Sequence, residues 1–314
     1  MARITTRDRI MKISGSDLLR DLDLTNDEVT ALLDLAIEVK QSPADYAGAL
    51  AGKSIALLFE KPSLRTRLTF ELAIKQLGGH SVLTEGPIGA REPLKDVARN
   101  LDRWVNGIVA RVFAQETVED LAQWASVPVI NALSDLYHPC QALADVQTVR
   151  ERFGSLAGRK LAFIGDGNNV AQSLMLTAIR LGMDFALGCP EGYLPNPEVV
   201  VQAEGLAAVS GSALRITHDV SEALDGAHAV YTDVWTSMGQ EREAAKRKRV
   251  FRPFQVNDEL MAKARPEAVF MHCLPARRGE EVTDEIMESG RSVVFEQAEN
   301  RLHAQKALLL MMLG

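Results

Sequence analysis

The sequence predicts an α/β protein with two doubly wound parallel-sheet domains. Short apolar runs alternate with helical patterns along the chain, as in parallel βα units. The alternation comes in two series, and 314 residues exceed the length that one hydrophobic core usually spans. We place the first domain at 1–150 and the second at 151–295, with a C-terminal helix at 296–314 that is free to return to the first domain. Because ligands bind beyond the carboxyl ends of parallel strands, we expect the active site in the cleft between the domains.

The first series begins with a helix, since a capping box of Thr25 and Glu28 precedes apolar residues at helical spacing. Apolar runs that predict buried strands lie at 54–59, 107–112 and 127–130. Helical patterns alternate with them at 66–77, 96–105, 118–125 and 139–153. One parallel sheet is therefore nearly complete by residue 135.

The second series opens with an apolar run at 160–164, after Gly154 and Gly158. Further strand-like runs lie at 184–187, 214–217, 229–232 and 268–271, with helices between them. This pattern predicts a second doubly wound sheet. Periodicity alone does not assign the last helix, at 296–313, to either domain.

The composition, with 46% hydrophobic and 25% charged residues, is that of an ordinary globular protein. A net charge of −7 argues against a general nucleic-acid binder, which needs a positive face. Cys140, Cys189 and Cys273 are widely spaced and odd in number, so we predict no disulfide framework and a reducing, cytoplasmic compartment. The apolar tail at 307–313 is too short to cross a bilayer, and the N-terminus is a poor secretory signal, so we expect neither a membrane span nor export.

The first candidate site follows the strand at 54–59. Ser63, Arg65 and Arg67 stand at the start of a predicted helix, where the helix dipole and free backbone N–H groups favour an anion. A phosphate would fit this position. The alternative is a capped helix with a solvated basic first turn, although arginines usually avoid the positive end of a helix dipole.

Two further motifs combine polar side chains with the start of a helix. His138 and Gln141, in the run HPCQ, suit a carbonyl oxygen and an amide group, unless His138 is only a cap and Gln141 faces solvent. The run GDGNN at 165–169 is placed like a dinucleotide-binding loop, but Val170 replaces the third glycine. A loop with Asn169 suits a small polar substrate instead, or is a tight turn without a ligand.

Two more strand ends carry reactive or charged side chains. Asp233 begins the run DVWTSMGQE, a carboxylate and a flexible loop that suit an ammonium-bearing ligand, or else an ordinary surface loop. Cys273 follows His272 at the end of the strand at 268–271. This pair indicates either a reactive thiolate or a buried structural cysteine.

Several other readings of the sequence are set aside. The basic run KRKR at 246–249 is predicted to be a solvated face, because the chain is acidic overall. No pair of histidines has metal-ligand spacing, and neither a GxSxG nor a GxxxxGK[ST] motif occurs. We therefore predict neither a metal nor another cofactor.

Taken in order, SLRTR, HPCQ, GDGNN, DVWTSMGQE and HCLPARRG resemble the motifs of ornithine carbamoyltransferases, and the likeness spans nearly the whole chain. Relatives that act on aspartate share the SxRTR and HPxQ elements but lack the SMG loop and the HCLP form. The resemblance implies transfer of the carbamoyl group of carbamoyl phosphate to the δ-amine of L-ornithine, giving citrulline and phosphate in arginine metabolism. It also implies a carbamoyl-phosphate domain at 1–150, an ornithine domain at 151–295, and a homotrimer with shared sites.

The resemblance further implies roles for individual residues. The implied carbamoyl phosphate contacts are Ser63, Leu64, Arg65, Thr66, Arg111, His138, Gln141, Cys273, Leu274 and Arg301. The implied ornithine contacts are Asn169, Asp233, Ser237 and Met238. The implied catalytic residues are Thr66, Arg111, His138 and Cys273. Of these, Thr66, Arg111 and His138 would stabilise the oxyanion that forms when the neutral amine attacks directly, while Cys273 would shape the ornithine site.

The sequence departs from the family pattern at two positions. Leu64 stands where many members have threonine, but its backbone N–H remains available. Pro87 stands where many members have a glutamine that reaches the neighbouring subunit's site, and proline donates from neither side chain nor backbone. Arg91 is a candidate to replace that contact.

Three alternative functions remain open at this point. A sister carbamoyltransferase for putrescine or an acylated ornithine would not need Asp233 for a free amine. An NAD-dependent oxidoreductase built on GDGNN lacks the third glycine. A non-catalytic carbamoyl-phosphate-binding protein would show a broken motif, and none is plainly broken.

Overall fold

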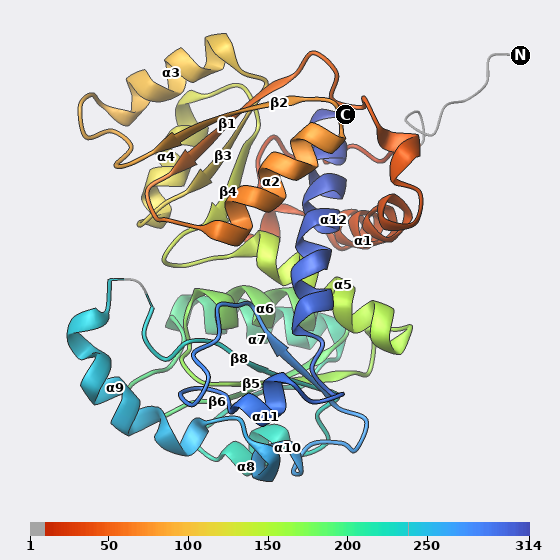
Figure 1. Cartoon of the computed structure of the whole chain (residues 1–314), viewed down its shortest axis with the longest axis vertical. Coiled ribbons are helices and arrows are strands. Elements are labelled where there is room, and N and C mark those ends of the chain that lie inside the picture. Colours follow the sequence, from red (N-terminus) through yellow and green to blue (C-terminus); the bar gives the residue numbers. More distant parts are fainter. Residues whose placement is uncertain (1–9, 238) are drawn as a thin grey trace, which may run out of the picture. The chain divides into compact units, whose positions relative to one another are not determined.

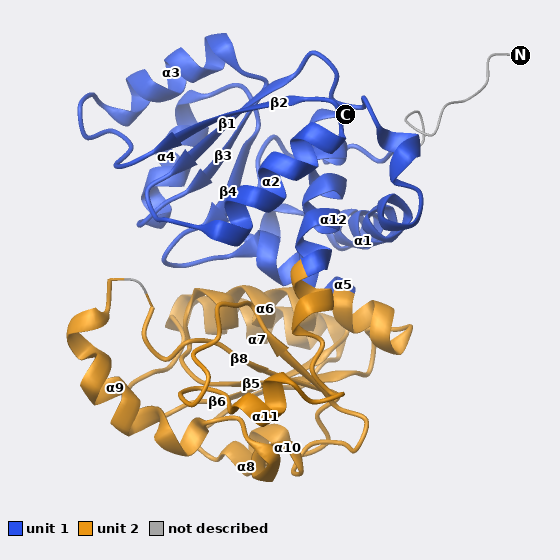
Figure 2. Ribbon diagram, viewed as in Figure 1, with its two compact units in different colours: residues 1–147, 299–314 blue, residues 148–298 orange. Residues whose placement is uncertain are grey.

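The computed structural model describes residues 10–237 and 239–314, and the chain divides into two compact units. Unit 1 comprises residues 1–147 and 299–314, and unit 2 comprises residues 148–298 (Figure 2). The chain passes from one unit to the other within two helices, α5 (Pro139–Phe153) and α12 (Val294–Leu313). The domain limits predicted at 150 and 296 fall within the same two helices.

Unit 1 is built on a four-stranded parallel sheet with the strand order β2-β1-β3-β4 (Figure 1). Its strands are β1 (Ser54–Phe59), β2 (His80–Glu85), β3 (Gly107–Arg111) and β4 (Val129–Leu133). Its remaining helices are η2 (Asp21–Asp23), α1 (Asn26–Gln41), η3 (Pro43–Tyr46), α2 (Leu64–Gln76), α3 (Leu94–Trp104) and α4 (Gln115–Trp124). From β1 the chain winds to β2 on one side and then returns to β3 on the other, so the winding reverses between β1 and β3.

Helices cover both faces of this sheet. On one face, Ala98 of α3 and Val118 of α4 pack against Leu58 and Ile108 of the sheet. Figure 1 shows α2 and α12 on the opposite face. The C-terminal half of α12 is apolar and almost completely buried, as expected for a helix surrounded by protein. Among residues 10–237 and 239–314, no helix is both long and apolar enough to span a membrane.

Unit 2 is built on a five-stranded parallel sheet with the order β7-β6-β5-β8-β9. Its strands are β5 (Lys160–Ile164), β6 (Asp184–Gly188), β7 (Leu214–Thr217), β8 (Ala229–Thr232) and β9 (Val269–His272). Its helices are α6 (Asn169–Arg180), α7 (Pro197–Ser210), α8 (Val220–Leu224), η4 (Glu241–Glu243), α9 (Ala244–Phe251), η5 (Arg252–Phe254), α10 (Asp258–Met261) and α11 (Asp284–Met287). Here the winding reverses between β5 and β8.

The predicted fold class is confirmed, since each unit has a parallel sheet whose strands alternate with helices along the chain. Strands β1, β5, β7 and β8 have the predicted limits. Strand β2 was not predicted. It lies at the edge of its sheet with five of its six residues exposed, so it lacks the apolar run that marks a buried strand.

Candidate active site

The carboxyl ends of β1 and β3 meet where the winding of unit 1 reverses. The backbone N–H of Glu60, just after β1, donates to the carbonyl of Arg111 at 2.9 Å. The Glu60 carboxylate accepts from the backbone N–H of Ile88 at 3.0 Å and of Phe113 at 2.8 Å. One half-buried carboxylate therefore joins the loops that follow β1, β2 and β3.

Helix α2 begins directly after this loop. Ser63 is its N-cap, with extended backbone angles of φ −154° and ψ 114°, and its hydroxyl makes no capping hydrogen bond in the described chain. The first N–H groups of α2 are thus not satisfied by their own cap, and they stand at the positive end of the helix dipole. Leu64 is 69% exposed, so the group that it offers to an anion at the start of α2 is its backbone N–H.

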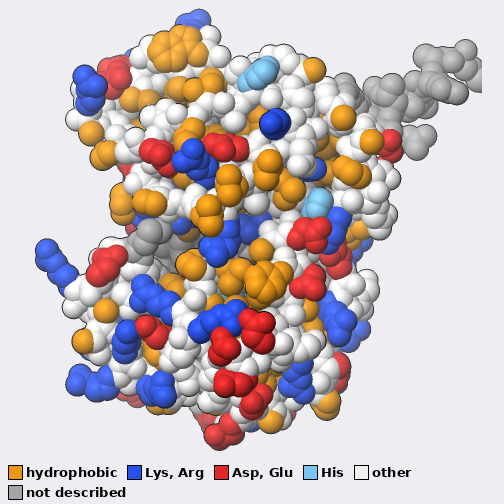
Figure 3. Space-filling model, in the orientation of Figure 1, with side chains coloured by type: hydrophobic (Ala, Val, Ile, Leu, Met, Phe, Trp, Pro, Cys, Tyr) orange, Lys and Arg blue, Asp and Glu red, His pale blue; other side chains and the backbone are white. Residues whose placement is uncertain are grey.

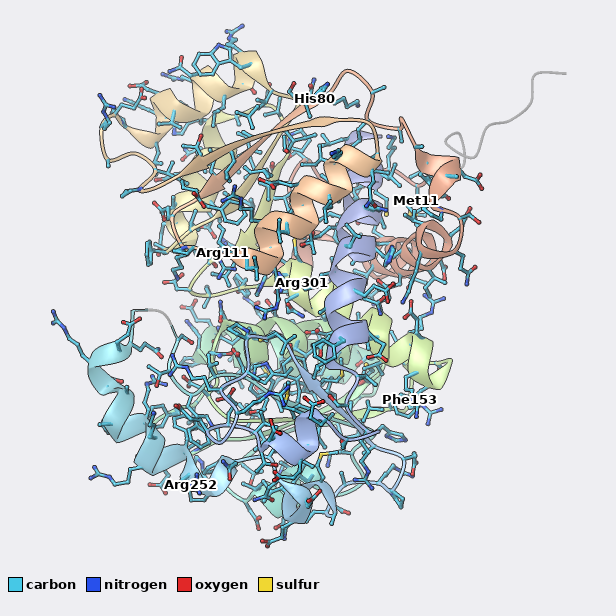
Figure 4. All side chains as sticks on the ribbon, viewed as in Figure 1. Met11, His80, Arg111, Phe153, Arg252 and Arg301 are labelled. Carbon is cyan, nitrogen blue, oxygen red and sulfur yellow. The ribbon has the colours of Figure 1, made fainter. Side chains whose placement is uncertain are left out.

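The hydroxyl of Thr66, in the first turn of α2, accepts hydrogen bonds from two guanidinium groups. Arg111 Nη1 donates to Thr66 Oγ1 at 3.3 Å, and Arg301 Nη2 donates to the same oxygen at 2.6 Å. All three side chains are buried, although they come from β3, α2 and α12. Figure 4 labels both arginines, at the end of β3 and on α12. Two positive charges held at the start of a helix form a strong site for an anion.

A further cation stands in the loop before α2. Lys61 is buried, and its Nζ lies 4.6 Å from the centre of the Phe113 ring. Burial, and then the nearby charge of Arg111, lower the pKa of Lys61. No role was predicted for Lys61, whose only signal in the sequence is a basic side chain two positions before Ser63.

His138 precedes α5 and faces the same arginines. Its carbonyl accepts from the backbone N–H of Gln141 at 3.0 Å, which closes the first turn of the helix. Burial, followed by the charges of Arg301 and Arg111, lowers the pKa of His138 well below its usual value. The imidazole is therefore neutral near pH 7, and it offers one N–H as a donor.

The Gln141 side chain is oriented by Asp145. Its Nε2 donates to Asp145 Oδ1 at 2.7 Å, and the residue is buried. With the amide held in this way, Gln141 Oε1 is buried and has no hydrogen-bond partner among the described residues. Gln141 therefore presents an acceptor suited to an N–H donor such as an amide NH₂.

In unit 2 the ends of β5 and β8 are joined by an asparagine. Asn168 Oδ1 accepts from the backbone N–H groups of Val170 at 3.0 Å and Ala171 at 3.1 Å, which caps α6. Its Nδ2 donates to Asp233 Oδ2 at 2.9 Å. Asn169 was predicted from the sequence but Asn168 was not, although its N-cap position next to Gly167 was an available signal.

Asp233, which follows β8, binds side chains that follow β5 and β9. Its Oδ1 accepts from the backbone N–H of Val234 at 2.7 Å and from Cys273 Sγ at 3.1 Å, while Oδ2 accepts from Asn168. The Asp233 side chain is buried. Cys273 thus acts as a thiol donor to a carboxylate, an arrangement that holds its proton in place.

The end of β9 is held by a buried histidine and glutamate. His272 Nδ1 accepts from the backbone N–H of Leu274 at 2.8 Å, and His272 Nε2 lies 3.1 Å from Glu281 Oε1. Ligand atoms of Asp233, His272 and Cys273 lie within 4.8 Å of one another, a spacing that would hold a metal ion. However, both nitrogens of His272 are engaged, so metal binding would require one of these hydrogen bonds to break.

The remaining predicted residues lie in the loop after β8 or beside Cys273. Ser237 N donates to Gln240 Oε1 at 3.1 Å, and Gln240 N donates to the Ser237 carbonyl at 3.1 Å, so the loop closes on itself. Met238 lies outside the described residues. Leu274 has a positive φ of 57° and packs against the core of unit 2.

The predicted site residues thus form two sets. The set in unit 1 comprises Ser63, Leu64, Arg65, Thr66, Arg111, His138, Gln141 and Arg301. The described set in unit 2 comprises Asn169, Asp233, Ser237, Cys273 and Leu274. Cys273 and Leu274, predicted as carbamoyl phosphate contacts, therefore belong to a different unit from the rest of that group.

Comparison with known proteins identifies the family of the chain. Residues 16–151 match the family model described as aspartate/ornithine carbamoyltransferase, carbamoyl-P binding domain, and residues 157–312 match its Asp/Orn binding domain. The ornithine carbamoyltransferase of Thermococcus kodakarensis is 49% identical over 310 residues, which cover 97% of this chain and 98% of the relative. That of Thermus thermophilus is 55% identical over 290 residues, covering 91% and 93%.

A solved structure agrees with the sequence comparisons. The ornithine carbamoyltransferase of Pyrococcus furiosus superposes with a TM-score of 0.93 at 48% identity, covering 97% of this chain and 99% of that one. Both family models together cover most of the chain, and the relatives match it nearly from end to end. The chain therefore belongs to the aspartate/ornithine carbamoyltransferase family.

Proposed function

We propose that the protein transfers the carbamoyl group of carbamoyl phosphate to the δ-amine of L-ornithine, giving L-citrulline and phosphate. The observation that carries the proposal is the convergence of Arg111 and Arg301 on Thr66 at the start of α2. This cluster lies in the part of the chain that matches a carbamoyl-P binding domain, apart from Arg301 on α12. The names of the relatives support ornithine as the acceptor.

In this proposal unit 1 binds the phosphate end of the donor. The backbone N–H groups at Ser63 and Leu64, the Ser63 hydroxyl and the Arg65 side chain surround the phosphate at the positive end of α2. Arg111 and Arg301 add charge, and a planar guanidinium suits two phosphate oxygens at once. The burial of both arginines strengthens the attraction, because a charge that is screened less by water acts more strongly.

The carbamoyl end has donors and acceptors of its own. Thr66, Arg111 and the neutral imidazole of His138 donate to the carbamoyl oxygen. Gln141 Oε1, which has no partner among the described residues, accepts from the carbamoyl NH₂. The donors and the acceptor together distinguish the oxygen of the carbamoyl group from its nitrogen.

Unit 2 binds the acceptor in this proposal. Asp233 receives the α-ammonium group of ornithine, while Asn169, Ser237 and Met238 contact the amino-acid end. Cys273 and Leu274 border the δ-amine, and the thiol of Cys273 shapes the site because its proton is engaged by Asp233. The loop that contains Ser237 closes after carbamoyl phosphate has bound and excludes water from it.

The reaction needs no covalent enzyme intermediate. The lone pair of the neutral δ-amine forms a C–N bond to the carbamoyl carbon, and the carbonyl becomes a tetrahedral oxyanion. The C–O bond to phosphate then breaks, and the amine loses its proton to the departing phosphate or to water. Thr66, Arg111 and His138 stabilise the oxyanion more than the starting carbonyl, which lowers the barrier.

The proposal is tested by measuring citrulline and other carbamoylated products from carbamoyl phosphate with four separate acceptors at pH 8. The acceptors are L-ornithine, putrescine, N-acetyl-L-ornithine and L-aspartate. We expect product with ornithine only, because Asp233 needs a free α-ammonium group. Preference for another acceptor would retain the phosphate site but contradict the role of Asp233, and no product with any acceptor would favour a binding protein.

Replacing His138 tests the carbonyl contact. His138→Ala should lower kcat by about 10² to 10³ at saturating substrates, because one donor to the oxyanion is lost. His80→Ala is the matched control, since His80 is exposed on β2 and should leave kcat unchanged. Steady-state citrulline formation measures both, and a near-normal kcat for His138→Ala would exclude the assignment.

The pH dependence of the reaction tests the protonation states of the ornithine δ-amine and of the His138 imidazole. An amine with a pKa of about 10.4 is mostly protonated near neutrality, so kcat/KM for ornithine should rise by about tenfold per pH unit from pH 6 to 9. Because burial and two arginines keep His138 neutral, loss of its proton adds no step near pH 6.5. An inflection near pH 6.5 in the wild-type profile would contradict the neutral imidazole.

We further propose that the protein is a cytoplasmic homotrimer in which unit 1 contributes to the contact. Three leucines of α2 at helical spacing, Leu64, Leu68 and Leu72, are 69%, 44% and 42% exposed. Val82, on the neighbouring edge strand β2, is 56% exposed. Figure 3 shows apolar side chains gathered over α2 on this face. Such a stripe beside an unpaired strand edge is typical of a contact between subunits.

A charge in this stripe should weaken the assembly. Leu72→Glu is expected to shift the molar mass measured by light scattering from that of a trimer towards that of a monomer, because the carboxylate would lose its water in the contact. Val209→Glu is the control, since Val209 on α7 is 86% exposed. If Leu72→Glu and the wild type have the same mass at micromolar concentration, α2 is not part of the contact.

A further inference from the structure

We propose that Arg247 is a positioning residue for ornithine binding, because its guanidinium joins the two ends of the loop at 236–242 and ties that loop to the Asp233 site. The inference rests on the proposed function and extends it to a residue that does not touch substrate. Arg247 belongs to the basic run at 246–249, which was predicted to be a solvated face. Of these four described side chains only Arg247 is buried, with 6% of its surface exposed, so the prediction was wrong for this residue.

Arg247 holds both ends of the loop. Its Nη1 donates to the carbonyl of Trp235 at 3.0 Å, just before the loop begins. Its Nε donates to Glu243 Oε2 at 3.2 Å, just after the loop ends. The loop carries Ser237, so these two contacts bring together the ends of the segment proposed to bind the amino-acid end of ornithine.

The same guanidinium reaches the neighbouring strand end. Arg247 Nη1 lies 2.6 Å from Asp166 Oδ2, and the side chains are only 8% and 11% exposed. Asp166 belongs to the same short turn as Asn168, which donates to Asp233. The base of the loop is thus linked through one turn to the carboxylate that receives the α-ammonium group.

Aromatic rings fix the orientation of the guanidinium. The Arg247 Cζ lies 4.9 Å from the centre of the Tyr193 ring and 6.0 Å from that of Phe251. Trp235 stacks on Phe251, with ring centres 6.1 Å apart and planes at 25°. A lysine at this position keeps the charge but lacks the planar group that reaches Asp166, Trp235 and Glu243 together.

This geometry separates ornithine binding from carbamoyl phosphate binding. Without Arg247 the loop ends are free to part, and ornithine must then order the loop when it binds, which weakens its affinity. Among the described residues, the groups that Arg247 contacts all belong to unit 2. The KM for ornithine should therefore rise, while the KM for carbamoyl phosphate should stay nearly constant.

The test compares Arg247→Met, Arg247→Lys and Glu243→Gln with a matched control, Arg249→Met, which removes an exposed charge from the same helix. Both Arg247 variants should raise the KM for ornithine by about tenfold or more and change that for carbamoyl phosphate by less than about twofold. Glu243→Gln, which leaves the Asp166 pair intact, should raise the KM for ornithine by about two- to fivefold without lowering Tm. Arg249→Met should match the wild type throughout.

A second readout needs no substrate. Limited trypsin digestion should cleave the Arg247 variants faster than the control after Arg242 or Lys246, because the loop and the start of α9 open more often.

Arg247→Met that folds with wild-type KM for both substrates would overturn the inference. If Arg247→Met does not fold, Glu243→Gln decides, and an unchanged KM for ornithine together with unchanged cleavage would overturn it. A wild-type protein without citrulline formation would reject the proposed function, whereas the cleavage rates would still report on the loop.

Discussion

The reversal of winding within each sheet is the constraint on which the candidate site depends. At β1 and β3, and again at β5 and β8, successive connections leave in opposite directions, so the strand ends are not covered by a crossing loop. The start of α2 and Arg111 occupy the first reversal, and Asn168 and Asp233 occupy the second. The polar groups thus stand where the backbone leaves room for them.

Within each unit one side chain accepts hydrogen bonds from several others and so orients them. The Thr66 hydroxyl accepts from two guanidinium groups, and the Asp233 carboxylate accepts from an amide, a thiol and a backbone N–H. Such hubs fix the side chains before any ligand arrives, which is the arrangement that electrostatic catalysis needs. Thr66 and Asp233 are buried, so the side chains that donate to them, although distant in sequence, are held together inside the folded unit.

Much of this organisation follows from the sequence, because buried parallel strands leave apolar runs with definite limits. The family and the reaction were predicted from the five motifs and agree with the comparisons. The residue roles stay predictions. What the sequence did not reveal depends on the tertiary environment. Strand β2 is mostly exposed at the edge of its sheet, and Lys61 and Arg247 have the sequence context of surface charges. No local pattern separates a buried arginine from its exposed neighbours when its ion-pair partner, Asp166, lies 81 residues away along the chain.

The orientation of Gln141 has a consequence for the balance between stability and function. The buried Gln141 oxygen has no hydrogen-bond partner in the described part of the chain, which destabilises the free protein by about 1–3 kcal/mol, whereas the paired amide nitrogen does not. An apolar side chain of similar shape would remove that penalty, but it would also remove the donor at 2.7 Å to the buried Asp145 carboxylate, which is itself destabilising. Gln141 thus marks a position where the free protein is less stable than it would be with every buried polar atom paired, and where a bound amide group would restore that stability.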